Sequence, residues 1–210
     1  MRVLIPFDPR KPKTRLGGVL SADERRAFAE AMLRDVLGAV RNADATPLVL
    51  STAEIELDGV SVRVDERPLS PAVNAYRRET TGPLCVLLAD LPLVTCKAID
   101  RLLEPAADIV IAPGLGGGTN ALAIRHPDFR VDYHGSSYLD HRDAARAVGA
   151  SVATVDSFRL GVDVDEPADI VEVLLHGSGR ADAWLRDAGF RLDSQSGRVT
   201  AVRISDEMTA

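Results

Sequence analysis

Three aspartates lie where they could bind a divalent cation. Asp90 directly follows the continuous apolar run of residues 84–89, and Asp163 and Asp165 lie two positions apart in the segment 161–167. In an open α/β sheet, ligands bind just beyond the carboxyl ends of the strands. Hard carboxylate oxygens suit Mg²⁺, particularly when substrate phosphates complete its coordination shell. These three side chains therefore form a minimal candidate metal site for phosphoryl chemistry.

Two of these aspartates also have structural alternatives. Asp90 could begin a turn or cap the next helix, and Asp165 could cap a helix that begins at Pro167. Asp163 has no such alternative. If residues 160–164 are extended, Asp163 and Asp165 share a face, and a divalent cation would relieve the repulsion between them.

A basic loop follows the first predicted strand. Lys11, Lys13 and Arg15 lie within five residues, and the only other lysine of the chain is Lys97. A loop that leaves a strand and enters a helix is a natural phosphate site. A solvated basic loop is the usual alternative for a run of charges. The scarcity of lysine elsewhere favours phosphate binding, with Lys13 and Arg15 as the candidates.

Two further segments could bind anions. Consecutive glycines at 116–118 allow close approach of a ligand to the backbone, and the Thr119 hydroxyl can donate to a phosphate or carboxylate oxygen. His134 and Ser137 lie where a helix begins, and the free N–H groups of a helix start attract anions. The alternatives are a plain flexible turn at the glycines, a surface histidine and an ordinary helix cap.

Alternating strand and helix patterns predict a layered α/β sheet that positions these loops. Ser21 and Glu24 form a capping box that begins the first helix, and Thr95 can cap a later one. Residues 160–164 are predicted to be extended. The other predicted strands are 2–6, 46–51, 60–64, 84–89, 108–112, 119–125 and 151–155. The other predicted helices are 71–79, 137–148 and 167–175.

Composition favours one α/β domain followed by a small appendage. The chain has 210 residues, a net charge of −6 and 46% hydrophobic residues. The acidic balance disfavours nucleic-acid backbones and anionic membranes as partners. No apolar stretch approaches the roughly 20 residues of a membrane span, and Cys85 and Cys96 form neither a metal motif nor a disulfide framework, so a cytoplasmic location is expected. We expect the main domain to span 1–177 and a helix and hairpin to follow in 178–210.

Together the motifs resemble those of the 2-phospho-L-lactate guanylyltransferases. The resemblance covers residues 2–177 and rests on five ordered segments: 13–16, 88–92, 117–122, 133–138 and 161–167. It implies a three-layer α/β/α fold of the nucleotide-diphospho-sugar-transferase type, Rossmann-like, with a mixed and mostly parallel sheet. The implied reaction joins GTP to 2-phospho-L-lactate, or to phosphoenolpyruvate in some relatives. Its products are lactyl-2-diphospho-5′-guanosine and pyrophosphate, in the biosynthesis of coenzyme F420. The resemblance also implies a homodimer.

The resemblance assigns roles to individual residues. The implied Mg²⁺ ligands are Asp90, Asp163 and Asp165. Residues implied to bind the phosphorylated three-carbon acid are Thr119, His134, Gly135 and Ser137. Residues implied to bind nucleotide are Pro6, Lys13 and Asn74. Two departures concern the acceptor: His134 replaces a common glycine, and an acidic residue often found in the glycine run before Thr119 is missing.

The predicted mechanism is in-line attack of the acceptor phosphate on the α-phosphorus of GTP. No general base is needed because the attacking phosphate is already anionic, so catalysis comes from positioning and charge neutralisation. Asp90, Lys13 and Arg15 are the predicted catalytic residues. Two alternatives are a nucleotidyltransferase for a sugar phosphate or the molybdenum cofactor, and a non-catalytic nucleotide-binding module. The segment 6–9 lacks the glycine-rich opening of the former, and the acidic trio disfavours the latter.

Overall fold

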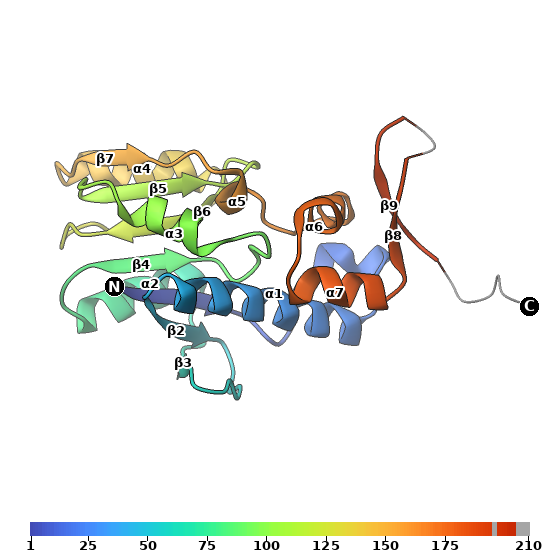
Figure 1. Ribbon diagram of the computed structural model, residues 1–210. Coiled ribbons are helices and arrows are strands. Elements are labelled where there is room, and N and C mark those ends of the chain that lie inside the picture. The colour runs from blue at the N-terminus through green and yellow to red at the C-terminus, as the bar shows by residue number, and fades with distance from the viewer. Residues whose placement is uncertain (195–196, 205–210) are drawn as a thin grey trace, which may run out of the picture.

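Seven strands form a mixed central sheet in the computed structural model, which describes residues 1–194 and 197–204. Within that part of the chain, the spatial order is β3-β2-β1-β4-β6-β5-β7 (Figure 1). β6 is antiparallel to β4 and β5, and the other neighbouring pairs are parallel. This confirms the predicted mixed, mostly parallel sheet. The strands are β1 (Arg2–Phe7), β2 (Thr46–Ser51), β3 (Ser61–Val64), β4 (Leu84–Leu87), β5 (Ile109–Pro113), β6 (Thr119–Ile124) and β7 (Val152–Thr154).

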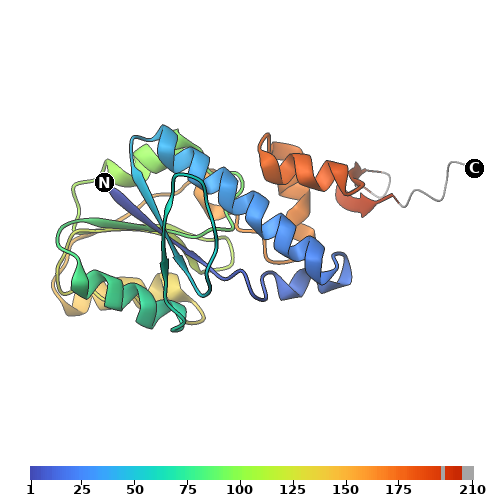
Figure 2. The ribbon, with the colours of Figure 1, turned by 90° about the horizontal axis from the view of Figure 1, so that it is seen from below.

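Helices cover both faces of this sheet, which gives the predicted three layers (Figure 2). α1, α3 and α5 pack on one face, and α2 and α4 pack on the other. The helices of these layers are α1 (Ala22–Asn42), α2 (Leu69–Glu79), α3 (Cys96–Leu103), α4 (Ser137–Ala147) and α5 (Phe158–Gly161). A 3-10 helix, η1 (Thr14–Gly18), lies between β1 and α1.

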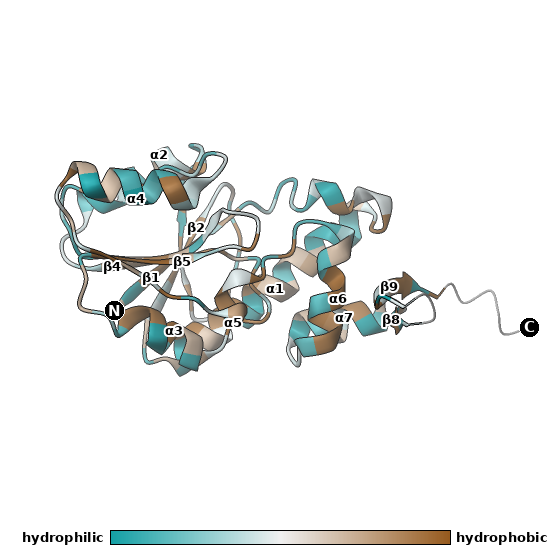
Figure 3. Ribbon diagram, turned by 90° about the horizontal axis from the view of Figure 1, so that it is seen from above, coloured by the Kyte–Doolittle hydropathy of each residue, from teal (hydrophilic) through white to brown (hydrophobic). Residues whose placement is uncertain are grey.

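The central strands are apolar on both sides because both of their faces are covered. Ile5 of β1 packs in the cluster beneath α1, and its neighbour Leu4 packs in the cluster beneath α2. All four residues of β4 are buried. Colouring by hydropathy shows brown in the central strands, and both teal and brown along the helices that flank them (Figure 3). Cys85 in β4 is fully buried, and burial raises the pKa of its thiol to about 12, so this thiol is part of the core.

Two of the predicted N-terminal caps are present at the starts of α1 and α3. The Ser21 side chain accepts from the Glu24 main-chain N–H while the Glu24 carboxylate accepts from the Ser21 N–H, which confirms the capping box. Thr95 caps α3 by accepting from the Ala98 N–H. Among the described residues, no helix is long and apolar enough to cross a bilayer.

The prediction that residues 160–164 are extended is wrong for its first two residues. Leu160 and Gly161 end α5, and the Ser157 carbonyl accepts hydrogen bonds from their main-chain N–H groups at 3.1 Å and 2.8 Å. This turn buries the Leu160 side chain completely. Val162 is extended, and residues 162–164 belong to no helix or strand. Periodicity alone does not distinguish a buried helical turn from a buried strand in so short an apolar run.

The C-terminal elements pack against the part of α1 that extends beyond the sheet (Figure 1). They are η2 (Pro167–Asp169), α6 (Ile170–His176), α7 (Arg180–Asp187) and an antiparallel pair, β8 (Phe190–Asp193) and β9 (Thr200–Arg203). The rings of Phe28 and Trp184 lie 5.2 Å apart between centroids. The Asp35 carboxylate of α1 accepts from the main-chain N–H groups of Arg180 (2.7 Å) and Ala181 (2.9 Å), so a side chain of α1 caps α7.

Candidate active site

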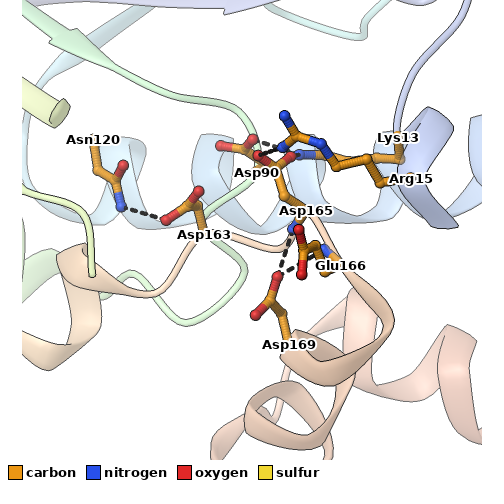
Figure 4. Close-up of polar contacts among 8 residues, drawn as sticks. All are labelled: Lys13, Arg15, Asp90, Asn120, Asp163, Asp165, Glu166 and Asp169. Atoms are coloured by element: carbon orange, nitrogen blue, oxygen red, sulfur yellow. Dashed lines mark hydrogen bonds and ion pairs between the residues drawn. The ribbon is translucent and has the colours of Figure 1, made fainter. Parts of the chain in front are cut away.

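Lys13, Arg15, Asp90 and Asp165 form one ion-pair cluster at the edge of the sheet (Figure 4). Lys13 Nζ lies 2.5 Å from Asp90 Oδ2 and 2.8 Å from Asp165 Oδ1. Arg15 Nη1 lies 3.2 Å from Asp165 Oδ2. Asp90 follows β4, Lys13 precedes η1 and Asp165 precedes η2, so the cluster joins three loops that are distant in sequence.

Lys13 is the buried centre of this cluster. Its side chain is only 10% exposed, whereas that of Arg15 is 67% exposed. Burial alone would lower the pKa of Lys13, but the carboxylates of Asp90 and Asp165 more than offset this, so the pKa is raised and the ammonium charge is retained. The Lys13 backbone is also left-handed, with φ 52° and ψ 46°, a conformation that disfavours a residue with a Cβ. Such local strain is found preferentially at functional sites.

One carboxylate oxygen of this cluster has no hydrogen-bond partner in the part of the chain that the structure describes. Asp90 Oδ1 is buried and unpartnered within the described part of the chain, although Oδ2 binds Lys13. The Asp90 carbonyl accepts from the Val164 N–H at 3.1 Å, which ties the loop after β4 to the segment that bears the other two aspartates. A buried carboxylate oxygen without a partner is costly unless a ligand completes its bonding.

Asp163 and Asp165 have different partners. Asn120 donates to Asp163 Oδ1 at 3.1 Å and to the Leu160 carbonyl at 2.9 Å. Burial raises the pKa of Asp163, and the charges of Asp90 and Asp165 raise it further, whereas the Asn120 hydrogen bond lowers it. Among the described residues, no basic side chain forms an ion pair with Asp163, so its ionised form is left without a compensating positive charge there.

Asp165 does not cap the helix that follows it. Asp169 Oδ2 accepts from the main-chain N–H groups of Asp165 (2.9 Å) and Glu166 (2.7 Å), so Asp169 satisfies the start of η2. The Asp165 carboxylate is thereby left for Lys13 and Arg15 (Figure 4). The alternative in which Asp165 caps a helix is therefore wrong.

The donor types fit a divalent cation, although the side chains do not form a coordination shell. Within residues 1–194 and 197–204, no group of three or more histidine, cysteine, aspartate or glutamate side chains is arranged around a common metal position. Lys13 Nζ instead lies between Asp90 and Asp165. The unpartnered oxygen of Asp90 and the uncompensated carboxylate of Asp163 are nevertheless hard oxygen donors of the kind that Mg²⁺ takes.

A cleft of about 560 Å³ opens beside this cluster, a volume typical of small-molecule sites. It includes three of the predicted site residues, Pro6, Lys13 and Asp90. Apolar side chains of α1, β2 and α2 line its wall, among them Met32 and Leu50. The cleft therefore joins an apolar wall to the charged cluster at its rim.

A β-bulge at the start of β6 sets the direction of two polar side chains. Ala112 of β5 pairs with Ala121, but Pro113 pairs with Thr119, so β6 has one extra residue there. Thr119 contacts His141 on α4, whereas Asn120 contacts α5 and the loop after it. Asn120 thus faces the same layer as its neighbour Ala121, so the bulge breaks the alternation of the strand between these two residues and turns Thr119 toward α4.

The other predicted site residues lie apart from the charged cluster. His134 is 82% exposed and pairs with Asp132, which raises the pKa of its imidazole. Gly135 has φ +40°, and Ser137 is buried in the first turn of α4. Asn74 does not line the cleft: its amide donates to the Val131 carbonyl at 2.8 Å and accepts from the Val131 N–H at 2.9 Å. Nucleotide binding by Asn74 stays a prediction.

Asn120 and His141 also belong to the site region, although neither is among the residues predicted from the sequence. Asn120 follows Thr119 directly, but its direction depends on the bulge, which the sequence pattern does not reveal. The sequence could have indicated His141, because it lies one turn after Ser137 on a predicted helix. Residues with this spacing share a helix face. Both residues are buried.

The chain is similar in sequence to known proteins over nearly its whole length. Residues 1–207 match the family described as "Guanylyl transferase CofC like". The 2-phospho-L-lactate guanylyltransferase of Haloferax volcanii is 58% identical over 204 residues, which cover 97% of this chain and 98% of that protein. The enzyme of the same name from Haloarcula marismortui is 56% identical over 207 residues, with 97% and 99% covered.

Solved structures agree on the fold. A Desulfovibrio desulfuricans protein assigned to the nucleotide-diphospho-sugar transferases superposes with a TM-score of 0.71 at 18% identity, over 89% of this chain and 94% of that one. The 2-C-methyl-D-erythritol 4-phosphate cytidylyltransferase of Thermus thermophilus has a TM-score of 0.56 at 19% identity, over 88% and 98%. The fold is therefore that of the nucleotidyltransferases.

Proposed function

We propose that the chain transfers the guanylyl group of GTP to 2-phospho-L-lactate, because it belongs to the family of CofC-like guanylyl transferases. The products would be lactyl-2-diphospho-5′-guanosine and pyrophosphate, as in coenzyme F420 biosynthesis. The cluster of Lys13, Asp90 and Asp165 at the rim of the cleft is the structural observation that supports this proposal.

The proposed step is an in-line displacement at phosphorus. A phosphate oxygen of the acceptor forms a bond to the α-phosphorus of GTP, and the bond from that phosphorus to the β-phosphate bridging oxygen breaks. The electron pair of the broken bond leaves with pyrophosphate. Lys13, which precedes η1, and Arg15, within η1, neutralise the charge that develops on this leaving group. The apolar wall of the cleft receives the nucleoside.

A divalent cation, Mg²⁺ in this proposal, would be held by Asp90, Asp163 and Asp165. When bound it would neutralise phosphate charge and align the reacting groups. Two observations support the assignment: Asp90 Oδ1 is buried without a partner in the described chain, and burial raises the pKa of Asp163. Asn120 holds Asp163 in place through its hydrogen bond.

The acceptor is proposed to bind at the start of β6 and α4. Thr119 and Ser137 supply hydroxyl groups there, Gly135 permits close approach of the backbone, and His134 supplies an exposed imidazole. β6 begins beside the end of β4, since the Leu88 N–H donates to the Asn120 carbonyl at 3.0 Å. The proposed acceptor site thus adjoins the loop that bears Asp90.

The test is pyrophosphate release from GTP, with Mg²⁺ and either 2-phospho-L-lactate or phosphoenolpyruvate. We expect release with GTP and 2-phospho-L-lactate, and its loss when EDTA removes the metal. Release only with sugar phosphates, or under no condition, would contradict the proposal. Preference for phosphoenolpyruvate would keep the reaction class and change the acceptor.

Asp90→Asn tests the metal assignment directly. We expect kcat to fall at least about 100-fold, as on loss of one strong electrostatic contact. Asp100→Asn is the matched control, because Asp100 is exposed on α3. Mn²⁺ binding measured by electron paramagnetic resonance should weaken in the Asp90 variant and not in the control. The cytoplasmic homodimer is also part of the proposal, and light scattering of the purified protein checks the dimer.

A further inference from the structure

His141 on α4 is a buried histidine that the proposed chemistry leaves unused. Its side chain is fully buried between aromatic rings, with the Tyr133 ring edge-on at 4.9 Å and the Phe129 ring at 6.0 Å. Both ring nitrogens have partners. Nε2 lies 3.0 Å from the Asp132 main-chain nitrogen, and Nδ1 lies 2.9 Å from Thr119 Oγ1.

These partners determine the tautomer of His141. A main-chain N–H can only donate, so Nε2 must accept from Asp132 and carries no hydrogen. The neutral ring therefore carries its hydrogen on Nδ1 and donates it to Thr119 Oγ1. Burial lowers the pKa of His141 to about 4, although the Asp132 charge opposes this, so the ring is neutral at physiological pH.

The Thr119 hydroxyl is consequently left with a hydrogen to donate. Its oxygen accepts from His141, and among the described residues it has no second hydrogen-bond partner. Thr119 is only 2% exposed, so bulk water does not readily supply an acceptor. The hydroxyl lies against α4, where its partner His141 follows Ser137 by one helical turn.

We propose that His141 is a positioning residue, which fixes the Thr119 hydroxyl as a donor toward an anionic oxygen of the acceptor substrate. The inference rests on the proposed function, since the acceptor is a phosphorylated acid. It concerns acceptor binding and leaves the GTP site unaffected, because the bond from His141 leads to Thr119 and not to the cluster around Lys13.

Two near-isosteric variants separate the two bonds of the ring. His141→Asn places an amide NH₂ where Nδ1 lies, so it keeps the donor to Thr119. His141→Gln places an amide group where Nε2 lies, so it keeps an acceptor for Asp132 and loses the donor. We expect His141→Gln to raise the KM for 2-phospho-L-lactate about tenfold with the KM for GTP within about twofold, and His141→Asn to restore the acceptor KM.

A double-mutant cycle with Thr119→Val tests whether His141 acts through Thr119. Once the hydroxyl is absent, His141→Gln should add no further increase in the acceptor KM, since coupled residues are non-additive. Equal effects of Gln and Asn, additive effects with Thr119→Val, or a parallel rise in the KM for GTP would overturn the inference.

Nitrogen-15 NMR of the wild-type protein gives a readout independent of variant folding. We expect the His141 proton on Nδ1, with no titration between pH 5.5 and pH 8; a proton on Nε2 would overturn the assignment. If the wild type releases no pyrophosphate with any acceptor, the proposed function fails and the inference falls with it. Normal turnover with an unchanged acceptor KM in His141→Gln overturns the inference alone.

Discussion

Lys13 and Asp90 are 77 positions apart in sequence, yet Lys13 Nζ lies 2.5 Å from Asp90 Oδ2. The contact joins the phosphate-binding loop predicted after β1 to the acidic residue that follows β4. Because β1 and β4 are adjacent parallel strands, their carboxyl ends meet at the same edge. The basic group that we propose for the leaving phosphates and the acidic group that we propose for a cation are thereby held together as an ion pair.

Replacing Lys13 by Met should lower kcat/KM with GTP by about 100-fold or more, because the variant removes a buried cation from the pyrophosphate side. Lys11→Met is the matched control, since Lys11 lies in the same loop but is exposed and does not line the cleft. Steady-state kinetics of pyrophosphate release measure both variants. Equal losses in the two would show that overall loop charge, and not Lys13 itself, matters.

Gly114→Ala should impair the site through Asn120. A Cβ at Gly114 would lie 2.6 Å from Asn120 Oδ1, so the amide that holds Asp163 must shift. Gly116→Ala is the control, because a Cβ there meets nothing within 4 Å. We expect at least a several-fold rise in the Mg²⁺ concentration needed for half-maximal activity in Gly114→Ala only. An unchanged requirement would argue against the role of Asn120.

Acid should destabilise the protein through His141. The pKa of His141 is about 4 in the folded chain, so the unfolded chain, with an ordinary pKa near 6.5, binds the proton first. Protonation of His141 therefore leaves the free energy of unfolding unchanged above about pH 6.5. It lowers that free energy as the pH drops toward 4, by about 3 kcal/mol in total. Urea unfolding of the wild type and His141→Asn at several pH values measures this. The pH slope should be shallower in the variant, and identical slopes would contradict the assignment.

Asp35→Ala should destabilise the C-terminal elements. Asp35 caps α7 from α1, and the loss of such a cap costs about 1–2 kcal/mol. Asp100→Ala, an exposed change on α3, should cost much less. Gly179→Ala should resemble Asp35→Ala, since its Cβ would lie 2.4 Å from Asp35 Oδ1. Thermal unfolding measures all three, and a normal Tm in Asp35→Ala would exclude the capping role.

The sequence predicted the layers, most elements and the residues at strand ends, because these follow from local apolar patterns. Asp90 could be recognised as a candidate site residue because a carboxylate at the end of a buried apolar strand does not contribute to core packing. The helical turn at residues 160 and 161 could not be predicted because a buried helical turn and a buried strand look alike over a few residues. The hydrogen bond between Thr119 and His141 could not be predicted from the sequence. It depends on strand register and on the β-bulge of β6, both of which are properties of the tertiary structure.

The single added residue in β6 has an architectural consequence. With Asn120 in regular pairing, strict alternation would place Thr119 on the same side as Ala121 and Ala123, which pack beneath α1 and α3. The bulge accommodates Asn120 as an extra residue and so keeps Thr119 against α4. Deleting Asn120 would therefore leave Thr119 facing α4 but would remove the amide that holds Asp163.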